Sequence, residues 1–183
     1  MRYFFTSDFH LGHFNIIKYC GRPFKTLEEH DETIITNHNN RVKEDDIVFY
    51  IGDFCFKNSA GGKKGEGVPI KAKEYLAKLK GKFIFIQGNH DRNNSLKTPI
   101  TKCHIRLAGK TFNLVHNPEY VDMDVPINIV GHIHQNWTIK RIKKGEKFTD
   151  AINVGVDVNG FKPITFEEVM SKYHKWLKSE KYK

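Results

Sequence analysis

One apolar run constrains the fold more than any other part of the chain. Residues 83–86 are aromatic or β-branched, and Gly88, Asn89, His90 and Asp91 follow them. Such a run predicts a buried strand, and the glycine marks the point where the strand ends. The residues after the glycine carry an amide, an imidazole and a carboxylate, all of which can bind a metal ion. The sequence therefore predicts a functional site where this strand ends.

The same change from apolar to polar residues occurs at the ends of four further predicted strands. A single polar residue after a strand is usually part of a turn. Five such strand ends are difficult to explain as turns, and ligands in open α/β sheets gather outside the carboxyl ends of the strands. We therefore expect the polar side chains to converge. They are Asp8 and His10 after residues 3–5, Asp53 after 47–51, His116 after 112–115, and His132 and His134 after 127–130.

The order of the predicted elements indicates an α/β fold in one domain, residues 1–183. A chain of this length can bury one hydrophobic core. Capping boxes at residues 26–29 and 165–168 predict the starts of two helices. In the first half, helices alternate with strands, which predicts a parallel sheet with crossover helices. In the second half, the turns at 108–110 and 143–146 predict hairpins in a second, more antiparallel sheet.

Composition and charge restrict the partners and the compartment. The formal net charge of +9 favours anionic partners such as phosphates or nucleic acid, although runs of lysine are more often solvated surface. No apolar run approaches the ~20 residues of a membrane span, and the N-terminus lacks a signal-peptide pattern, so we expect no membrane partner. Three widely spaced cysteines predict neither disulfides nor a cysteine zinc site, which favours the cytoplasm. The oligomeric state stays open.

The types and spacing of the polar residues predict a metal centre. Asp8 and His10 are two residues apart, as are His132 and His134, so each pair can leave one face of an extended segment and reach one ion. Imidazole suits zinc, iron and nickel, whereas carboxylate and amide oxygens suit manganese and magnesium. Seven candidate ligands exceed what one ion takes with an open position, so we expect two divalent ions bridged by a carboxylate such as Asp53. We expect manganese, ahead of iron, zinc, nickel, cobalt or magnesium.

Such a pair of metal ions can promote hydrolysis. Two metal ions about 3.5–4 Å apart convert a shared water into hydroxide and hold the attacking and leaving oxygens of an in-line displacement. Phosphate esters fit this geometry. The sequence therefore favours a phosphoesterase.

Five motifs stand in order along the chain: Asp8-x-His10, Gly52-Asp53, Gly88-Asn89-His90-Asp91, His116 and Gly131-His132-x-His134. The ordered set resembles the calcineurin-like metallophosphoesterases, in particular the small members without a cap domain found in bacteria and phages. Each motif alone is weak, but the five in order are highly specific. The resemblance implies a four-layer α/β/β/α sandwich with a dimetal centre at the strand ends. It also implies ligand roles: Asp8, His10 and His134 on one ion, Asn89, His116 and His132 on the other, and Asp53 bridging.

The resemblance implies a catalytic role for His90. This histidine would lie over the phosphate, stabilise it and protonate the departing alkoxide. The bridging hydroxide would attack directly, so we expect no phosphoenzyme. Many relatives carry a carboxylate three residues after the bridging aspartate, which orients the histidine, but this chain has Phe56 there. The group that orients His90 is therefore open.

Four residues near the motifs are candidates for supporting roles. Arg92 could hold phosphate oxygens through two hydrogen bonds, with a surface salt bridge as an equal alternative. His13 is expected to line the substrate pocket, whereas Arg22 is expected to lie outside the site. Asp91 is expected to support a metal ligand.

These observations predict a metal-dependent phosphoesterase that acts on a phosphodiester or a phosphomonoester, with nucleotides or nucleic acid among the candidate substrates. One alternative is a metal-dependent nuclease. The basic charge and a predicted loop of glycine and lysine at residues 57–68 favour it, but no stripe of basic and aromatic residues is evident. A second alternative is a non-catalytic metal-binding scaffold. We expect such a scaffold to lack ligands or His90, and this chain has all of them.

Overall fold

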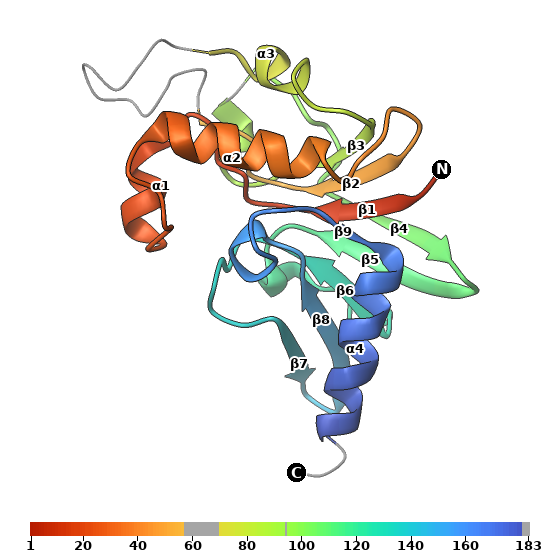
Figure 1. The fold of residues 1–183 in the computed structure, drawn as a ribbon. Helices are drawn as coiled ribbons and strands as arrows, with labels where there is room; N and C mark the ends of the chain where they lie inside the picture. Colours follow the sequence, from red (N-terminus) through yellow and green to blue (C-terminus); the bar gives the residue numbers. More distant parts are fainter. Residues whose placement is uncertain (57–69, 94, 181–183) are drawn as a thin grey trace.

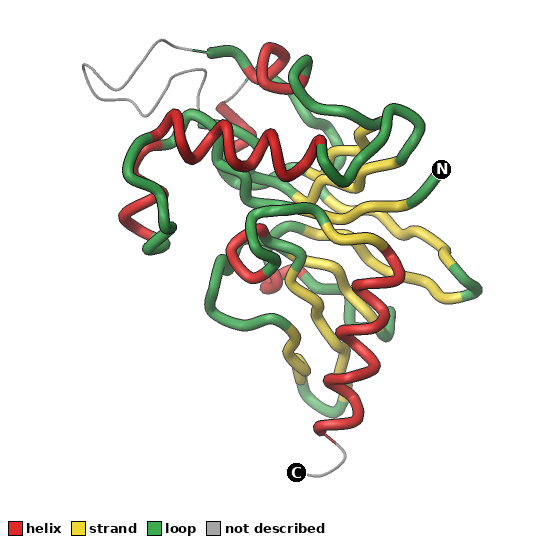
Figure 2. Tube along the Cα trace, viewed as in Figure 1, coloured by secondary structure: helices red, strands yellow, loops and turns green. Residues whose placement is uncertain are grey.

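The structure is a computed structural model that describes residues 1–56, 70–93 and 95–180. The loop predicted at residues 57–68 lies outside the described residues. Two β-sheets stack on each other, and helices pack against them (Figure 1). Figure 2 shows the strands of both sheets in the middle of the molecule and the helices around them. The predicted α/β sandwich of two sheets and helices is confirmed.

The first sheet contains three parallel strands, β1 (Tyr3–Thr6), β2 (Ile47–Ile51) and β3 (Lys82–Ile86). A short strand, β9 (Ile164–Thr165), pairs antiparallel with β1, which gives the strand order β3-β2-β1-β9. The parallel sheet predicted for the first half is thus confirmed. In the described parts of its connections lie three helices, α1 (Phe14–Tyr19), α2 (Leu27–Asn39) and α3 (Ala72–Leu76).

The second sheet is mixed. The predicted hairpins are present, one formed by β4 (Lys102–Leu107) and β5 (Lys110–Val115), the other by β7 (Ile139–Lys144) and β8 (Lys147–Asn153). Between them, β6 (Ile127–Val130) pairs parallel with both β5 and β8. These three strands therefore end at the same edge of the sheet. Three 3-10 helices, η1 (Asp91–Asn93), η2 (Pro118–Tyr120) and η3 (Val156–Val158), follow β3, β5 and β8.

Apolar side chains between the sheets form the main core. Phe5 of β1 and Phe49 of β2 stack with ring centroids 5.1 Å apart, and both face the second sheet. The last helix, α4 (Phe166–Glu180), adds Val169 and Tyr173 to this core, in agreement with the apolar stripe in its sequence. Helix α4 thus packs against the second sheet, and it also lies next to the first sheet (Figure 1).

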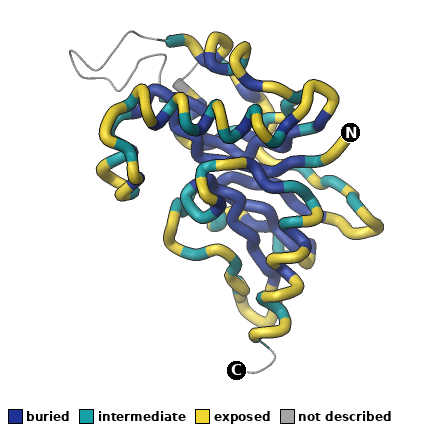
Figure 3. Tube along the Cα trace, in the orientation of Figure 1, coloured by how far each residue is buried: buried dark blue, intermediate teal, exposed yellow. Residues whose placement is uncertain are grey.

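The helices α2 and α3 cover the outer face of the first sheet. Ile34 of α2 and Tyr75 of α3 pack with Tyr50 of β2. The hydroxyl oxygen of Thr26 accepts a hydrogen bond from the Glu29 amide at 3.1 Å, so the predicted cap starts α2. Figure 3 shows buried strands beneath helices whose outer sides are exposed. No helix in the described parts of the chain has the length and apolar character that crossing a membrane requires.

The two sheets are joined at the edge where the parallel strands end. Ser7, directly after β1, forms a parallel bridge with Gly155, which follows β8. The Val156 amide donates a hydrogen bond to the Ser7 carbonyl at 3.2 Å. Because β1 and β8 belong to different sheets, this bridge places the carboxyl ends of both sheets next to each other. Side chains that follow the strands can therefore meet.

Gly81, directly before β3, has a conformation and surroundings that only glycine fits. Its φ is +104°, and an added Cβ would lie 2.7 Å from Val42 Cγ1. We expect Gly81→Ala to lower the free energy of unfolding by about 3 kcal/mol, because backbone strain and overpacking add. The control is Gly145→Ala, with φ of +61° and no atom within 4 Å, which should cost about 1 kcal/mol. Equal losses in denaturant unfolding would show that packing at Gly81 contributes nothing.

Candidate metal centre

Five of the predicted site residues have a backbone conformation that is rare for residues with a side chain. A positive φ in a residue other than glycine costs about 1–3 kcal/mol and persists only where the surrounding structure enforces it. All five residues lie shortly after the carboxyl end of a strand, where this conformation turns the chain sharply. They are Asp8 (φ 61°), His10 (52°), Asp53 (59°), His132 (73°) and His134 (46°).

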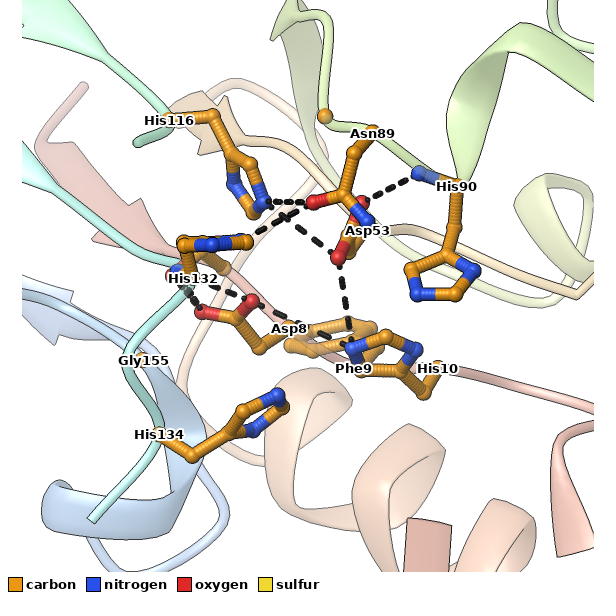
Figure 4. A network of polar contacts seen from close by, with 12 residues as sticks. Asp8, Phe9, His10, Asp53, Asn89, His90, His116, His132, His134 and Gly155 are labelled. Carbon is orange, nitrogen blue, oxygen red and sulfur yellow. Dashed lines mark hydrogen bonds and ion pairs between the residues drawn. The ribbon is translucent and has the colours of Figure 1, made fainter. Parts of the chain in front are cut away.

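The carboxylate of Asp53 lies in the middle of the predicted ligands (Figure 4). Its Oδ2 is 3.5 Å from His10 Nε2 and 3.3 Å from His116 Nε2. Its Oδ1 accepts a hydrogen bond from the His90 amide at 2.9 Å. Asp53 thus has imidazoles from two different strand ends on either side, which is the arrangement expected of a bridging ligand.

One group of predicted ligands consists of Asp8, His10 and His134. Their candidate ligand atoms lie within 4.8 Å of one another. Asp8 is fully buried, and its carboxylate accepts hydrogen bonds from the Ser7 hydroxyl at 2.5 Å and from the His132 amide at 3.1 Å. These bonds fix the carboxylate toward the two histidines.

A second group contains Asp53, His116 and His132, again within 4.8 Å of one another. Asn89 joins this group, because its Oδ1 is 3.2 Å from His116 Nε2 and 2.9 Å from His132 Nδ1. His116 Nδ1 donates a hydrogen bond to the Ile51 carbonyl at 2.7 Å, so its Nε2 faces the site. The structure thus brings the seven predicted ligands together in two adjacent groups.

The residues of both groups fit a pair of divalent ions. His10 Nε2 is buried and has no hydrogen-bond partner among the described residues, a costly state for a polar atom without a ligand. Carboxylate, imidazole and amide donors together suit first-row divalent ions. The donor atoms of both groups face the same space, where a bound cation would be surrounded by them.

Two glycines of the motifs make room for the ligands. At Gly88, an added Cβ would lie closer than 3.0 Å to the Asp53 carboxylate. At Gly52, where φ is +85°, it would lie closer than 3.0 Å to the ring of His116. A side chain at either position would therefore push a ligand out of place, which explains why glycine occurs in these motifs.

Asp91 joins the segments that follow β2 and β3. Its carboxylate accepts hydrogen bonds from the amides of Asp53 at 2.8 Å, Phe54 at 3.0 Å and Gly88 at 2.8 Å. Asp91 is also buried. It therefore positions the backbone that carries Asp53 and Asn89, while its supporting role in metal binding stays a prediction.

Arg22 and Asp157 form a buried ion pair behind the site. The guanidinium donates two hydrogen bonds of 2.8 Å to the Asp157 carboxylate, and it also donates to the carbonyls of Asp8 at 2.7 Å and Phe9 at 3.0 Å. Asp157 Oδ2 lies 2.9 Å from His134 Nδ1. The pair thus orients the ring of His134 and holds the strained backbone at Asp8.

Sequence reasoning placed Arg22 outside the site and did not single out Asp157. The two residues lie 135 positions apart, and neither belongs to one of the five motifs. His30 of α2 extends the same network, because its Nε2 is 2.7 Å from an Arg22 nitrogen. The one available signal was an arginine soon after the first motif, and spacing alone could not distinguish it from a surface residue.

The ring of His90 lies at the edge of the site, next to the ring of His10 (Figure 4). Its centroid is 5.1 Å from that of His10 and 5.8 Å from that of His13. Phe56 stacks on His13 at 4.3 Å and lies 6.2 Å from His90. These three rings thus lie next to His90, and Phe56 occupies the position where a carboxylate was considered from the sequence. His13 is buried, and burial lowers its pKa to about 4, so its ring is neutral at neutral pH.

Two surface cavities lie on the two sides of the ligands. One, of about 280 Å³, is lined by Asn89, His116 and Arg92. The other, of about 360 Å³, is lined by His90 and His134 among others. Arg92 is exposed beside the second group of ligands, where its guanidinium can approach an anion.

Comparisons with known proteins agree with this fold. The family profile described as calcineurin-like phosphoesterase matches residues 1–182. The uncharacterized protein MJ1445 of Methanocaldococcus jannaschii is 37% identical over 175 residues, which cover 92% of this chain and 89% of that protein. The Gene 66 protein of Mycobacterium phage L5 is 34% identical over 87 residues, 48% of this chain and 38% of that protein.

A solved structure has the same fold. The crystal structure of AQ665 from Aquifex aeolicus, a protein of unknown function, superposes with a TM-score of 0.65 at 23% identity, over 93% of this chain and 98% of that chain. At this identity the likeness supports the fold alone. The family match covers nearly the whole sequence, so the chain belongs to the calcineurin-like phosphoesterase family, as predicted.

Charges in the site change the proton affinity of two histidines. Burial lowers the pKa of His116, but its hydrogen bond to Asp53 and the carboxylates of Asp53 and Asp8 outweigh this and raise it to about 9. Burial also lowers the pKa of His134, but its hydrogen bonds with Asp157 and Cys20 and the charge of Asp8 outweigh this and raise it to about 10. Both rings therefore hold a proton at neutral pH before an ion binds.

We expect metal binding to weaken as the pH falls, because an ion must displace the protons from His116 and His134. Since both pKa values are raised, acid favours the protonated rings, which cannot bind an ion. Calorimetric titration of metal-free protein with manganese should give at least about tenfold weaker binding at about pH 6 than at about pH 8.5. Titrations in two buffers of different ionisation enthalpy should reveal proton release. Affinity that is constant with pH would contradict the assignment of these ligands.

We expect Asp157→Asn to weaken metal binding about 10- to 100-fold, because the neutral amide loses the ion pair with Arg22 and accepts a weaker hydrogen bond from His134. The matched control is Asp150→Asn in β8. Asp150 is also buried and accepts a hydrogen bond of 2.8 Å from an arginine, Arg141, but it contacts no predicted ligand. Affinity by calorimetry and metal content after dialysis provide the measurements. Equal effects of the two substitutions would mean that Asp157 acts on stability alone.

Proposed function

We propose that this protein is a dimetal-dependent phosphoesterase that hydrolyses a phosphodiester or a phosphomonoester. The observation that supports this most is the position of the Asp53 carboxylate, 3.5 Å from His10 Nε2 and 3.3 Å from His116 Nε2. It lies between two groups of ligands that each suit one divalent ion. The proposed ligands are Asp8, His10 and His134 for one ion, Asn89, His116 and His132 for the other, and Asp53 for both.

Two bound ions would supply an activated water and neutralise charge on the phosphate. We propose manganese as the native ion, because carboxylate and amide oxygens accompany the imidazoles. Iron, zinc, nickel, cobalt and magnesium are the competing candidates.

The chain's own residues supply the remaining chemistry. We assign proton transfer to the leaving oxygen to His90, whose ring lies at the edge of the site and lines a cavity beside the ligands. Arg92 is proposed to bind phosphate oxygens, because its guanidinium borders the other cavity. His13, buried and neutral, is proposed to form the wall behind His90.

A non-catalytic scaffold is the weaker alternative. The candidate ligand atoms of His90, His10 and Asp53 also lie within 4.8 Å of one another, but seven other residues already supply the two proposed ions, which leaves His90 for catalysis. The proposed compartment is the cytoplasm, since no disulfide joins the three cysteines, all of which lie in described parts of the chain.

Hydrolysis of bis(4-nitrophenyl) phosphate by metal-free protein, with each candidate ion added in turn, tests the proposal. We expect turnover that depends on added metal and that a chelator abolishes. If the protein hydrolyses no substrate with any of these ions, the result would favour the non-catalytic scaffold. Turnover that persists in chelator would exclude a metal-dependent mechanism.

We expect His90→Ala to lower kcat about 10²- to 10⁴-fold for substrates with an alkyl leaving group, which must gain a proton to depart. The loss should be smaller for nitrophenyl substrates, because nitrophenolate leaves without a proton. Metal content, measured by elemental analysis, should stay unchanged. The control is His104→Ala on the exposed side of β4, which should change neither quantity. Loss of metal from His90→Ala would show that this residue is a ligand.

A further inference from the structure

Two exposed tyrosines flank the proposed metal centre. Tyr19, the last residue of α1, is 69% exposed and lines the cavity of about 360 Å³ that also contains His90 and His134. Tyr120, the last residue of η2, is 67% exposed and lines the cavity of about 280 Å³ that also contains Arg92. Each side of the centre therefore has a cavity with one exposed aromatic ring.

The placement of these rings favours a ligand. Single exposed apolar residues are ordinary on protein surfaces. Among the described residues, however, the large exposed aromatic side chains are Tyr19, Tyr120 and Phe148, and two of these three border the site. Phe148 lies at the start of β8, at the opposite end from the site, and the guanidinium of Arg141 covers its ring at 5.0 Å. Neither tyrosine ring has a comparable cation over it among the described residues.

Charge and polar groups indicate what the rings bind. The chain carries a net charge of +9, which attracts anions such as a phosphodiester. Amide side chains line both cavities: Gln135 and Asn136 lie in the one with Tyr19, and Asn117 in the one with Tyr120, where its Oδ1 also accepts a hydrogen bond from the Glu119 amide at 2.9 Å. Amides that can donate and accept hydrogen bonds, next to an aromatic surface, are the groups that bind nucleobases.

We infer that the substrate is a phosphodiester that joins two nucleosides, with one base stacked on Tyr19 and the other on Tyr120. This inference rests on the proposed function, because it places the phosphate at the metal centre between the two cavities. Both cavities lie near the lower end of the size range of small-molecule sites. They therefore suit one nucleoside each.

The position of His90 distinguishes the two sides. His90 lines the cavity of Tyr19, so the leaving nucleoside lies there and the nucleoside that keeps the phosphate lies with Tyr120 and Arg92. In the reaction, a bond forms between water oxygen and phosphorus, and the bond from phosphorus to the oxygen of the leaving nucleoside breaks. That oxygen takes a proton from His90, and the proton of the attacking water passes to solvent.

The test uses a dinucleoside monophosphate and two analogues, each lacking one base. With the wild-type protein, loss of either base should lower kcat/KM about 5- to 100-fold. Tyr19→Ala should produce the same loss on the intact substrate and should remove the effect of deleting the base on the leaving side only. Tyr120→Ala should also lower kcat/KM on the intact substrate, and it should remove only the effect of deleting the other base. Tyr19→Phe and Tyr120→Phe should keep most of the rate, since phenylalanine also stacks, and Phe148→Ala should behave as wild type.

Two further measurements separate failure of this inference from failure of the proposed function. A small diester with alkyl arms should be hydrolysed equally by the wild type and by both alanine variants. Calorimetric binding of a non-hydrolysable dinucleoside analogue should weaken by a similar 5- to 100-fold in each alanine variant. If the diesters are hydrolysed but deleting the bases changes nothing, or if both tyrosines act on the same base, the inference is wrong while the proposed function stands. If no ester is hydrolysed and the analogue does not bind, both are wrong.

Discussion

The register of the parallel strands is the constraint on which the site depends. Tyr3 of β1 pairs with Ile47 of β2, and Ile47 pairs with Lys82 of β3. Because side chains alternate between the faces of a sheet, a slip of one residue would reverse the face of every residue in the strand. The stacked rings of Phe5 and Phe49 in the core oppose such a slip, because it would place them among the helices. Packing in the core thereby fixes where the chain leaves each strand and enters the site.

The strained turns beyond the strands are supported by residues outside the proposed ligand set. At Asp8, where φ is 61°, the Arg22 guanidinium holds the backbone carbonyl at 2.7 Å. At Asp53, where φ is 59°, the Asp91 carboxylate accepts the backbone N–H at 2.8 Å. These buried charged groups offset a local cost of about 1–3 kcal/mol per strained residue. The site therefore extends well beyond its ligands, and its ligand geometry depends on these charges.

The sequence was sufficient for features that depend on local pattern. Apolar runs that end in polar residues identified the strand ends, and parallel pairing made those ends meet. Contacts between distant residues were not predictable in this way. Arg22 and Asp157 are 135 positions apart, and each has an ordinary local sequence. Likewise, the sequence showed only that Phe56 stands where a carboxylate was considered. The residues around it in the sequence do not indicate that its ring stacks on His13. The hairpin turns predicted a second, more antiparallel sheet, but they carried no information on the partners of β6, which pairs parallel with β5 and β8.

Each group of proposed ligands draws on both sheets, so metal binding by these groups would be coupled to sheet packing. In the first group, Asp8 and His10 follow β1 of the first sheet, whereas His134 follows β6 of the second. In the second group, the strands of the first sheet supply Asp53 and Asn89, and those of the second supply His116 and His132. An ion bound by either group therefore links the sheets, and it stabilises the folded state because the unfolded chain has no such site. The interface between the sheets thus contains both the main hydrophobic core and the proposed metal ligands. The bridge between Ser7 and Gly155 holds the two sheets together at the edge where these ligands lie.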